Sequence, residues 1–73
     1  MAKKQILCEV AGKVLRVETV PGTKVLEGDT ILLIECMKME IPLVSPGSGS
    51  ITAILVGEGD NVAEGQVAAT LEI

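Results

Sequence analysis

The residues best placed to do chemistry lie near the middle of the chain, where Lys38 stands between Met37 and Met39, with Glu35 and Glu40 just beyond. A lysine amine has a reference pKa of about 10.4, so at neutral pH it is mostly protonated and a weak nucleophile. Covalent modification of Lys38 therefore needs an enzyme that activates an acyl donor and holds the amine close to it. Once acylated, the nitrogen becomes a neutral amide at the end of a flexible stem.

Two apolar runs, residues 31–34 and 39–44, lead into and out of this lysine, and their closeness predicts a β-hairpin with a two-residue turn at Met37-Lys38. The strand pairs that follow are Ile34 with Ile41 and Leu32 with Leu43. A type I′ turn needs positive φ at both central positions, which is why Asn-Gly usually occupies them. A turn built against its local preference is where a functional site is expected.

The same pairing sets Glu35 opposite Glu40 on the outer face of the hairpin. Like charges in that arrangement repel, which indicates a tip shaped for recognition at some cost in stability. The simpler alternative is that Lys38 is an ordinary solvated charge at the tip of a hairpin.

The sequence contains no histidine, and its only thiols are Cys8 and Cys36. A structural zinc site needs about four ligands, and without histidine no Ser-His or Cys-His nucleophile can form. We therefore expect no metal site and no catalytic residue. Both cysteines are interpreted as small buried hydrophobes, placed toward opposite ends of the molecule.

Composition narrows the class of protein further. With 73 residues the chain is expected to be one domain, residues 1–73, and its 48% hydrophobic content without aromatic residues predicts an aliphatic core. A net charge of −4 disfavours nucleic acid and anionic membranes as partners. No apolar stretch reaches spanning length, and Glu9 interrupts the apolar stretch after Lys3 and Lys4, which argues against membrane insertion and a signal peptide. We expect a cytoplasmic protein.

A first strand is predicted over residues 5–10, and after it one pattern occurs twice without a gap. The corresponding segments are residues 12–17 with 49–54, 22–28 with 59–65, and 32–35 with 69–72. Each half is a short unit of strands and glycine-containing turns that is too small to bury its own apolar face. The repeat predicts two halves packed about a pseudo-two-fold axis.

Alternation along the repeated strands predicts which side chains face the core. Those expected inside are Val67, Ala69, Leu71, Leu32, Ile34, Leu43, Ile41 and Met39. Those expected outside are Ala68 in the second half and, as an apolar strip on the hairpin, Ile31, Leu33, Pro42 and Val44. The strip is either an ordinary sheet surface or a docking face for partner enzymes. The repeat also puts the C-terminus at the end of the domain opposite Lys38.

The segment Glu35-Cys36-Met37-Lys38-Met39 resembles the Ala/Ser-Met-Lys-Met motif of biotinyl domains, which occur in biotin carboxyl carrier proteins and related carriers. The resemblance extends along the chain through Gly12, Val14, Gly22, Val25, Gly28, Pro46, Gly49, Gly59, Val62 and Gly65. It implies an all-β fold, a flattened barrel of two four-stranded antiparallel sheets, with an exposed hairpin that carries biotin in amide linkage to Lys38. Cys36 departs from the usual Ala or Ser but is also small. The connection 17–22 is too short for the protruding thumb of some bacterial carriers.

The resemblance also implies partners. A biotin protein ligase would recognise Glu35, Met37, Met39 and Glu40 around the lysine. Biotin carboxylase would load a carboxyl group on the biotin, and a carboxyltransferase would pass it to an acceptor, often an acyl-CoA. The chain itself would be a carrier and not an enzyme. A lipoyl carrier or a dual biotin/lipoyl attachment protein is the alternative, although lipoyl domains usually show Asp-Lys-Ala at the turn. An unmodified interaction module is a third possibility.

Overall fold

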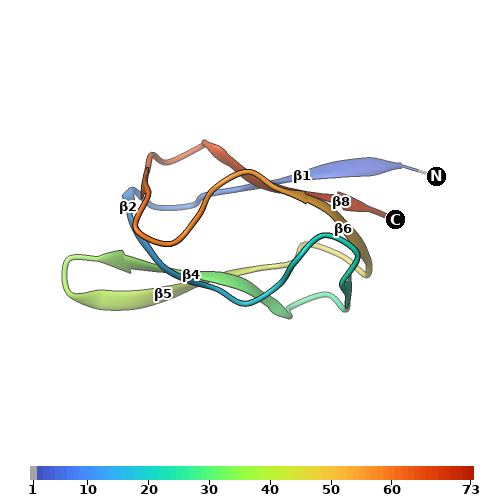
Figure 1. The fold of residues 1–73 in the computed structure, drawn as a ribbon, viewed down its shortest axis with the longest axis horizontal. Helices are drawn as coiled ribbons and strands as arrows, with labels where there is room; N and C mark the ends of the chain where they lie inside the picture. Colours follow the sequence, from blue (N-terminus) through green and yellow to red (C-terminus); the bar gives the residue numbers. More distant parts are fainter. Residues whose placement is uncertain (1) are drawn as a thin grey trace.

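The computed structural model describes residues 2–73, which form eight strands in two sheets (Figure 1). The strands are β1 (Lys3–Leu7), β2 (Gly12–Val17), β3 (Lys24–Val25), β4 (Thr30–Cys36), β5 (Met39–Val44), β6 (Gly49–Ile54), β7 (Asn61–Val62) and β8 (Val67–Glu72). One sheet has the order β1-β8-β6-β3 and the other β5-β4-β2-β7, and all neighbours are antiparallel. The predicted all-β fold of two four-stranded antiparallel sheets is confirmed.

The internal repeat is visible in the topology. Exchanging β1 with β5, β2 with β6, β3 with β7 and β4 with β8 turns the order of one sheet into that of the other. The turns repeat as well. Leu26 N–H donates to Asp29 Oδ2 in one half, and Ala63 N–H donates to Gln66 Oε1 in the other, both at 2.9 Å. The two halves are therefore related by a pseudo-two-fold axis, as the sequence predicts.

The core is aliphatic, and it contains two residues that alternation places on the wrong side. Ile31 and Ala68 are both 0% exposed, although the strict period of two puts them outside. The cause is a pair of β-bulges at equivalent places. The register of β4 on β5 shifts between Thr30 and Leu32, and that of β8 on β1 shifts at the corresponding position. A bulge adds one residue and resets the alternation, so neighbouring residues can both face the core.

The predicted first strand is also misplaced, because β1 ends at Leu7 and does not continue to residue 10. Beyond β1, the backbone of Cys8 forms hydrogen bonds with the turn that precedes β8. Its N–H donates to the Gln66 carbonyl and its carbonyl accepts from Gly65 N–H, both at 2.8 Å. These bonds hold the connection from β1 to β2 across one end of the barrel.

The β4–β5 hairpin projects beyond the rest of the barrel, at the left of Figure 1, and both termini lie at the other end. The position predicted for the C-terminus is thus confirmed. The last register pair between β4 and its neighbour β2 is Glu35 with Lys13, so the residues after Glu35 extend past the sheet. The prediction that Met39 faces the core is therefore wrong. Met39 is 63% exposed, because no strand of the other sheet covers this part of the hairpin. No helix among residues 2–73 is long and apolar enough to cross a membrane.

Two glycines are required by close packing between strands. A Cβ on Gly12 would collide with the carbonyl oxygen of Glu35, and one on Gly49 would collide with that of Glu72. We expect Gly12→Ala and Gly49→Ala each to lower the free energy of unfolding by about 2 kcal/mol, because backbone must move to admit the methyl group. Gly47→Ala is the control, since its Cβ would meet only a side-chain methyl of Ile73 at 3.5 Å. Denaturation followed by circular dichroism tests this, and equal stability of all three variants would contradict it.

Candidate functional site

The β4–β5 turn has the backbone that the sequence predicts for it. Met37 and Lys38 have φ of 52° and 65°, and they are the non-glycine residues with positive φ in the described chain. The predicted pairs of Ile34 with Ile41 and Leu32 with Leu43 are present, and Cys36 pairs with Met39 to close the turn. Positive φ at a non-glycine residue costs on the order of 1–3 kcal/mol. The strands impose this strain, because the burial of their apolar residues fixes the register.

Lys38 stands free at the tip of this turn. It is exposed, and its neighbour Met37 is 91% exposed. Over residues 2–73 a single ion pair forms, between Arg16 and Glu18, so the Lys38 amine has no carboxylate partner there. An unpaired primary amine on a projecting, backbone-constrained turn can be reached from several directions by an enzyme. The two exposed methionines beside it give a flexible apolar surround.

The two glutamates beside the tip lie as the sequence predicts. Glu35 on β4 and Glu40 on β5 are register partners, and both are exposed. Lys13 on β2 is the next residue along the same row, but no ion pair joins it to Glu35. The pair therefore presents two negative charges directly behind Lys38, a like-charge arrangement that is unfavourable for the isolated hairpin.

The apolar strip predicted on the outside of the hairpin is shorter in the structure. Leu33 and Pro42 are register partners, half-buried and exposed respectively, and Val44 is 42% exposed. Ile31 is removed from the strip because its bulge turns it into the core. On the other side of Leu33 the row continues to Arg16 of β2, so the strip ends at a charged residue.

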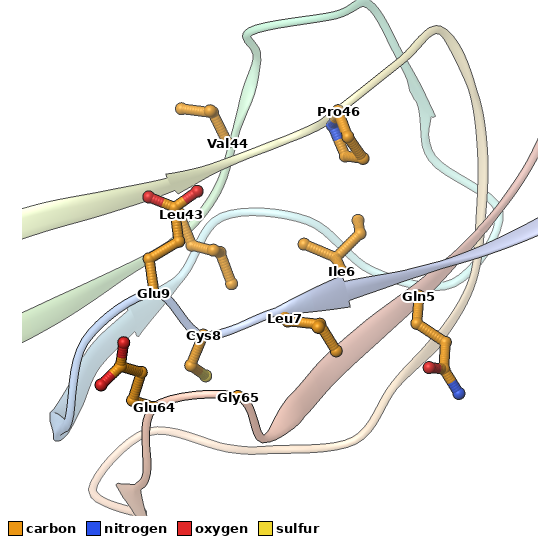
Figure 2. Close-up of a pocket in the computed structure, with 10 residues that line it drawn as sticks. All are labelled: Gln5, Ile6, Leu7, Cys8, Glu9, Leu43, Val44, Pro46, Glu64 and Gly65. Atoms are coloured by element: carbon orange, nitrogen blue, oxygen red, sulfur yellow. The ribbon is translucent and has the colours of Figure 1, made fainter.

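The two cysteines are both free thiols, Cys8 buried and Cys36 half-buried. Burial raises the pKa of the Cys8 thiol above its ordinary value. The expectation that the thiols lie toward opposite ends is wrong. A pseudo-two-fold axis exchanges the two ends, so Cys8 does not share the end of its counterpart Ser45. It follows β1, which runs from the terminal end toward the hairpin tip (Figure 1), and it lies beside Leu43 in Figure 2.

A groove that the sequence does not reveal lies between the edge strands β1 and β5 (Figure 2). Its volume is about 400 Å³, and its lining residues are Gln5, Ile6, Leu7, Cys8, Glu9, Leu43, Val44, Pro46, Glu64 and Gly65. No motif marks these residues, because the groove forms only when the two sheets are packed. Among residues 2–73, no three His, Cys, Asp or Glu side chains gather as a metal site would require.

Comparison with known proteins now bears on this hairpin. Residues 4–71 match the model of the family described as Biotin-requiring enzyme. The biotin/lipoyl attachment protein of Bacillus subtilis (strain 168) is 37% identical over 59 residues, 81% of each chain. Pyruvate carboxylase of Aspergillus niger is 37% identical over 58 residues, which are 80% of this chain and 5% of that protein. The solved urea carboxylase of Kluyveromyces lactis matches 99% of this chain and 6% of its own, with a TM-score of 0.93 and 28% identity.

These matches show that the chain belongs to the biotin/lipoyl attachment family. The resemblance drawn from the Met-Lys-Met segment is confirmed, and the class of protein is an attachment domain, a carrier. The chain spans only about a twentieth of the length of each of these two carboxylases. The residues at the tip fit a covalently attached biotin, because the amine of Lys38 is exposed, unpaired and held on a projecting turn.

The strain in the turn can be tested by giving it the residues that its backbone prefers. We expect Met37→Asn combined with Lys38→Gly to raise the free energy of unfolding by about 1–2 kcal/mol, because Asn-Gly adopts positive φ with little penalty. Denaturation must be followed by circular dichroism, since the chain has no aromatic residue. Met37→Ala, which leaves a non-glycine residue at positive φ, is the control and should not stabilise. An unchanged double variant would show that the turn is unstrained.

The placement of the thiols predicts their reactivity. Native protein treated with an alkylating agent should be modified at Cys36 within minutes, and at Cys8 only after unfolding, because Cys8 is 1% exposed and its raised pKa disfavours the thiolate. Mass spectrometry under non-reducing conditions should show no Cys8–Cys36 disulfide after mild oxidation. Equal rates at both thiols, or a linked pair, would contradict the burial of Cys8.

Proposed function

We propose that this chain is a biotin carboxyl carrier, a single domain over residues 1–73, with biotin in amide linkage to Lys38 Nζ. The observation that carries the proposal is the free amine of Lys38 on a strained, projecting turn between two exposed methionines. Membership of the biotin/lipoyl attachment family supports it. The domain would carry a group between enzymes and would not catalyse its transfer.

Attachment requires a biotin protein ligase, because Lys38 is a poor nucleophile while protonated. The ligase uses ATP to activate the carboxyl group of biotin as an acyl-adenylate. Lys38 Nζ loses a proton and forms the amide bond as AMP leaves. The chain contributes a reachable amine whose backbone is already fixed, so little freedom is lost when the ligase binds it.

We propose that the ligase reads the surroundings of the lysine through Glu35, Met37, Met39 and Glu40. The two glutamates form an unpaired negative site behind the tip, which a basic surface on the ligase would complement. The two methionines are exposed and can adapt to an apolar pocket. Recognition by charge and shape would explain why the hairpin keeps a repulsive pair and a strained turn.

Attached biotin supplies a ring nitrogen that accepts and releases a carboxyl group. The partners proposed are a biotin carboxylase, which loads it, and a carboxyltransferase, which passes it to an acceptor such as an acyl-CoA, in the cytoplasm. The hairpin projects from the end opposite both termini, so a linker leaving from either terminus would not cover Lys38 (Figure 1). A tethered carrier of this kind raises the effective concentration of its group at both enzymes.

A lipoyl carrier, or a protein that accepts both groups, is the second candidate. The similarity to the biotin/lipoyl attachment protein of Bacillus subtilis supports this second candidate. Met37 and Met39, where lipoyl domains usually have Asp and Ala, favour biotin. The mass of the adduct on the protein from its native cell separates the two candidates.

Substitution of the lysine tests the proposal. We expect Lys38→Arg to abolish modification by biotin ligase and to change the free energy of unfolding by less than about 0.5 kcal/mol, because the side chain is solvated and unpaired. Lys13→Arg and Lys24→Arg are matched controls on other strands and should be biotinylated like the wild type. Avidin blotting with peptide mass spectrometry provides the readout. Biotin on another lysine of the Lys38→Arg variant would refute the assignment.

A further inference from the structure

The internal repeat allows each position on the hairpin sheet (β5-β4-β2-β7) to be compared with an equivalent position on the other sheet. On the outer face of the hairpin sheet, Pro42 of β5 pairs with Leu33 of β4. Leu33 in turn pairs with Arg16 of β2, next to a bulge between Val14 and Arg16. A bulge sets two residues of one strand opposite one residue of its partner, so Leu15 lies opposite Leu33 beside Arg16. Leu15, Leu33 and Pro42 therefore form an apolar row across three strands.

The equivalent row in the other sheet is polar at all three positions. In the order β1, β8 and β6, its residues are Gln5, Thr70 and Thr52. The two rows have the same exposure, because in each the middle residue is half-buried and the two outer residues are exposed. The hydroxyls of Thr52 and Thr70 form a hydrogen bond, so these positions meet on the outer surface. The fold accepts polar side chains here, and the apolar row therefore needs a reason outside the fold.

Another exposed apolar residue of the hairpin sheet shows no such difference between the halves. Val44 is 42% exposed, and its counterpart Leu7 is 44% exposed. This position is apolar in both halves, and both residues line the groove between β1 and β5. Val44 is therefore explained by the shared architecture of the two halves and is not part of the apolar row.

The row next to the apolar row, nearer the hairpin tip, also departs from the repeat. Glu40 and Glu35 are register partners there, whereas the equivalent pair in the other sheet is Lys3 with Glu72. An apolar row and an acidic row thus lie side by side on the face that leads to Lys38. A partner that complements this surface has an apolar patch bordered by basic side chains.

The distance of the apolar row from Lys38 indicates which enzyme fits it. Pro42 is four residues from Lys38 along the hairpin and Leu33 is five, roughly 13 to 17 Å at about 3.3 Å per residue. The ligase acts on Lys38 Nζ, which a stem of about five bonds holds within roughly 6 Å of the backbone, so its surface must lie against the hairpin. An interface of about 800 Å² per partner has a radius of roughly 16 Å, enough to extend from the tip to the apolar row.

The other two proposed partners act farther from the backbone. Their substrate is the biotin ring, which about eleven bonds place up to roughly 14 Å from the Cα atom of Lys38. They can therefore reach the ring without covering the outer face of the hairpin. A second copy of this chain is also a poor fit, because Leu33 is half-buried and Leu15 is only 36% exposed. Such a row exposes far less than the roughly 800 Å² per partner of a stable interface.

We propose that the apolar row is a docking surface for the biotin protein ligase, in addition to the hairpin tip. The proposal rests on the proposed function, and it adds Leu15, Leu33 and Pro42 to the residues that the ligase contacts. Apolar side chains of the ligase cover the row and exclude water from it, while basic side chains beside them meet Glu35 and Glu40. A contact of this size suits an enzyme that binds briefly and releases its product.

The repeat itself supplies the variant that tests the proposal. Leu15→Thr, Leu33→Thr and Pro42→Gln together give the apolar row the residues of its counterpart, which the same fold already accommodates. With purified ligase, we expect the KM for this triple variant to rise about tenfold and kcat to change less than twofold, because the row does not touch the reacting atoms. Pro42→Gln alone, at an exposed edge position, should raise KM about threefold, and it decides the matter if the triple variant does not fold.

The control is Thr52→Leu with Thr70→Leu, which gives the opposite face the apolar residues of the hairpin sheet. Its KM should match that of the wild type, because this face leads away from Lys38. Circular dichroism shows whether each variant is folded before its kinetics are measured.

The remaining outcomes would overturn the docking surface. A KM unchanged by the folded variants of the row, or raised equally in the control, would exclude the row while leaving Lys38 as the biotinylated residue. A normal KM for ligase with slower carboxylation of the biotinylated triple variant would assign the row to biotin carboxylase. A dimeric wild type with a monomeric triple variant in sedimentation would assign it to a second copy. A wild type without a biotin adduct after incubation with ligase would overturn the proposed function as well.

Discussion

The constraint on which the functional end of this molecule depends is the register of β4 on β5. Leu32, Ile34 and Leu43 are buried, and a slip of one residue would turn them to solvent. Their burial is worth about 2 kcal/mol each, more than the strain of a poor turn. The core therefore forces Met37 and Lys38 into left-handed backbone. Lys38 is presented at the tip because the burial of residues several positions away fixes the register of the hairpin.

The same balance explains why the hairpin tolerates features that a stable hairpin would avoid. Glu35 faces Glu40, the turn lacks glycine, and Met37 is almost fully exposed. Each of these features lowers the stability of the hairpin. The fold tolerates them because the two halves of the repeat together bury a continuous aliphatic core. In the equivalent pair of the other half, Lys3 faces Glu72, an attractive arrangement. The repulsive version occurs only beside Lys38.

Much of this could be predicted from the sequence, for reasons that particular residues make clear. The unbroken repeat and the apolar runs around Met37-Lys38 define the strands, the turn and the position of the termini. Ile31 and Ala68 were misplaced because a bulge leaves no mark in an apolar run, and alternation then fails by one residue. Met39 was misplaced because a sequence does not show where the opposite layer ends. The groove between β1 and β5 depends on how the two sheets pack, so no local sequence pattern marks the residues that line it.

The pairing of β8 with β1 has a consequence for the connectivity of the molecule. Ile73 N–H donates to the Ala2 carbonyl at 2.9 Å, and this pair is the repeat equivalent of Cys36 with Met39. The termini thus occupy the place of a second tight turn. Linking residues 2 and 73 through a two-residue turn and opening the chain between β2 and β3 would give a circular permutant with the same sheets. Two Met-Lys turns, one at each end, would then make a carrier with two arms.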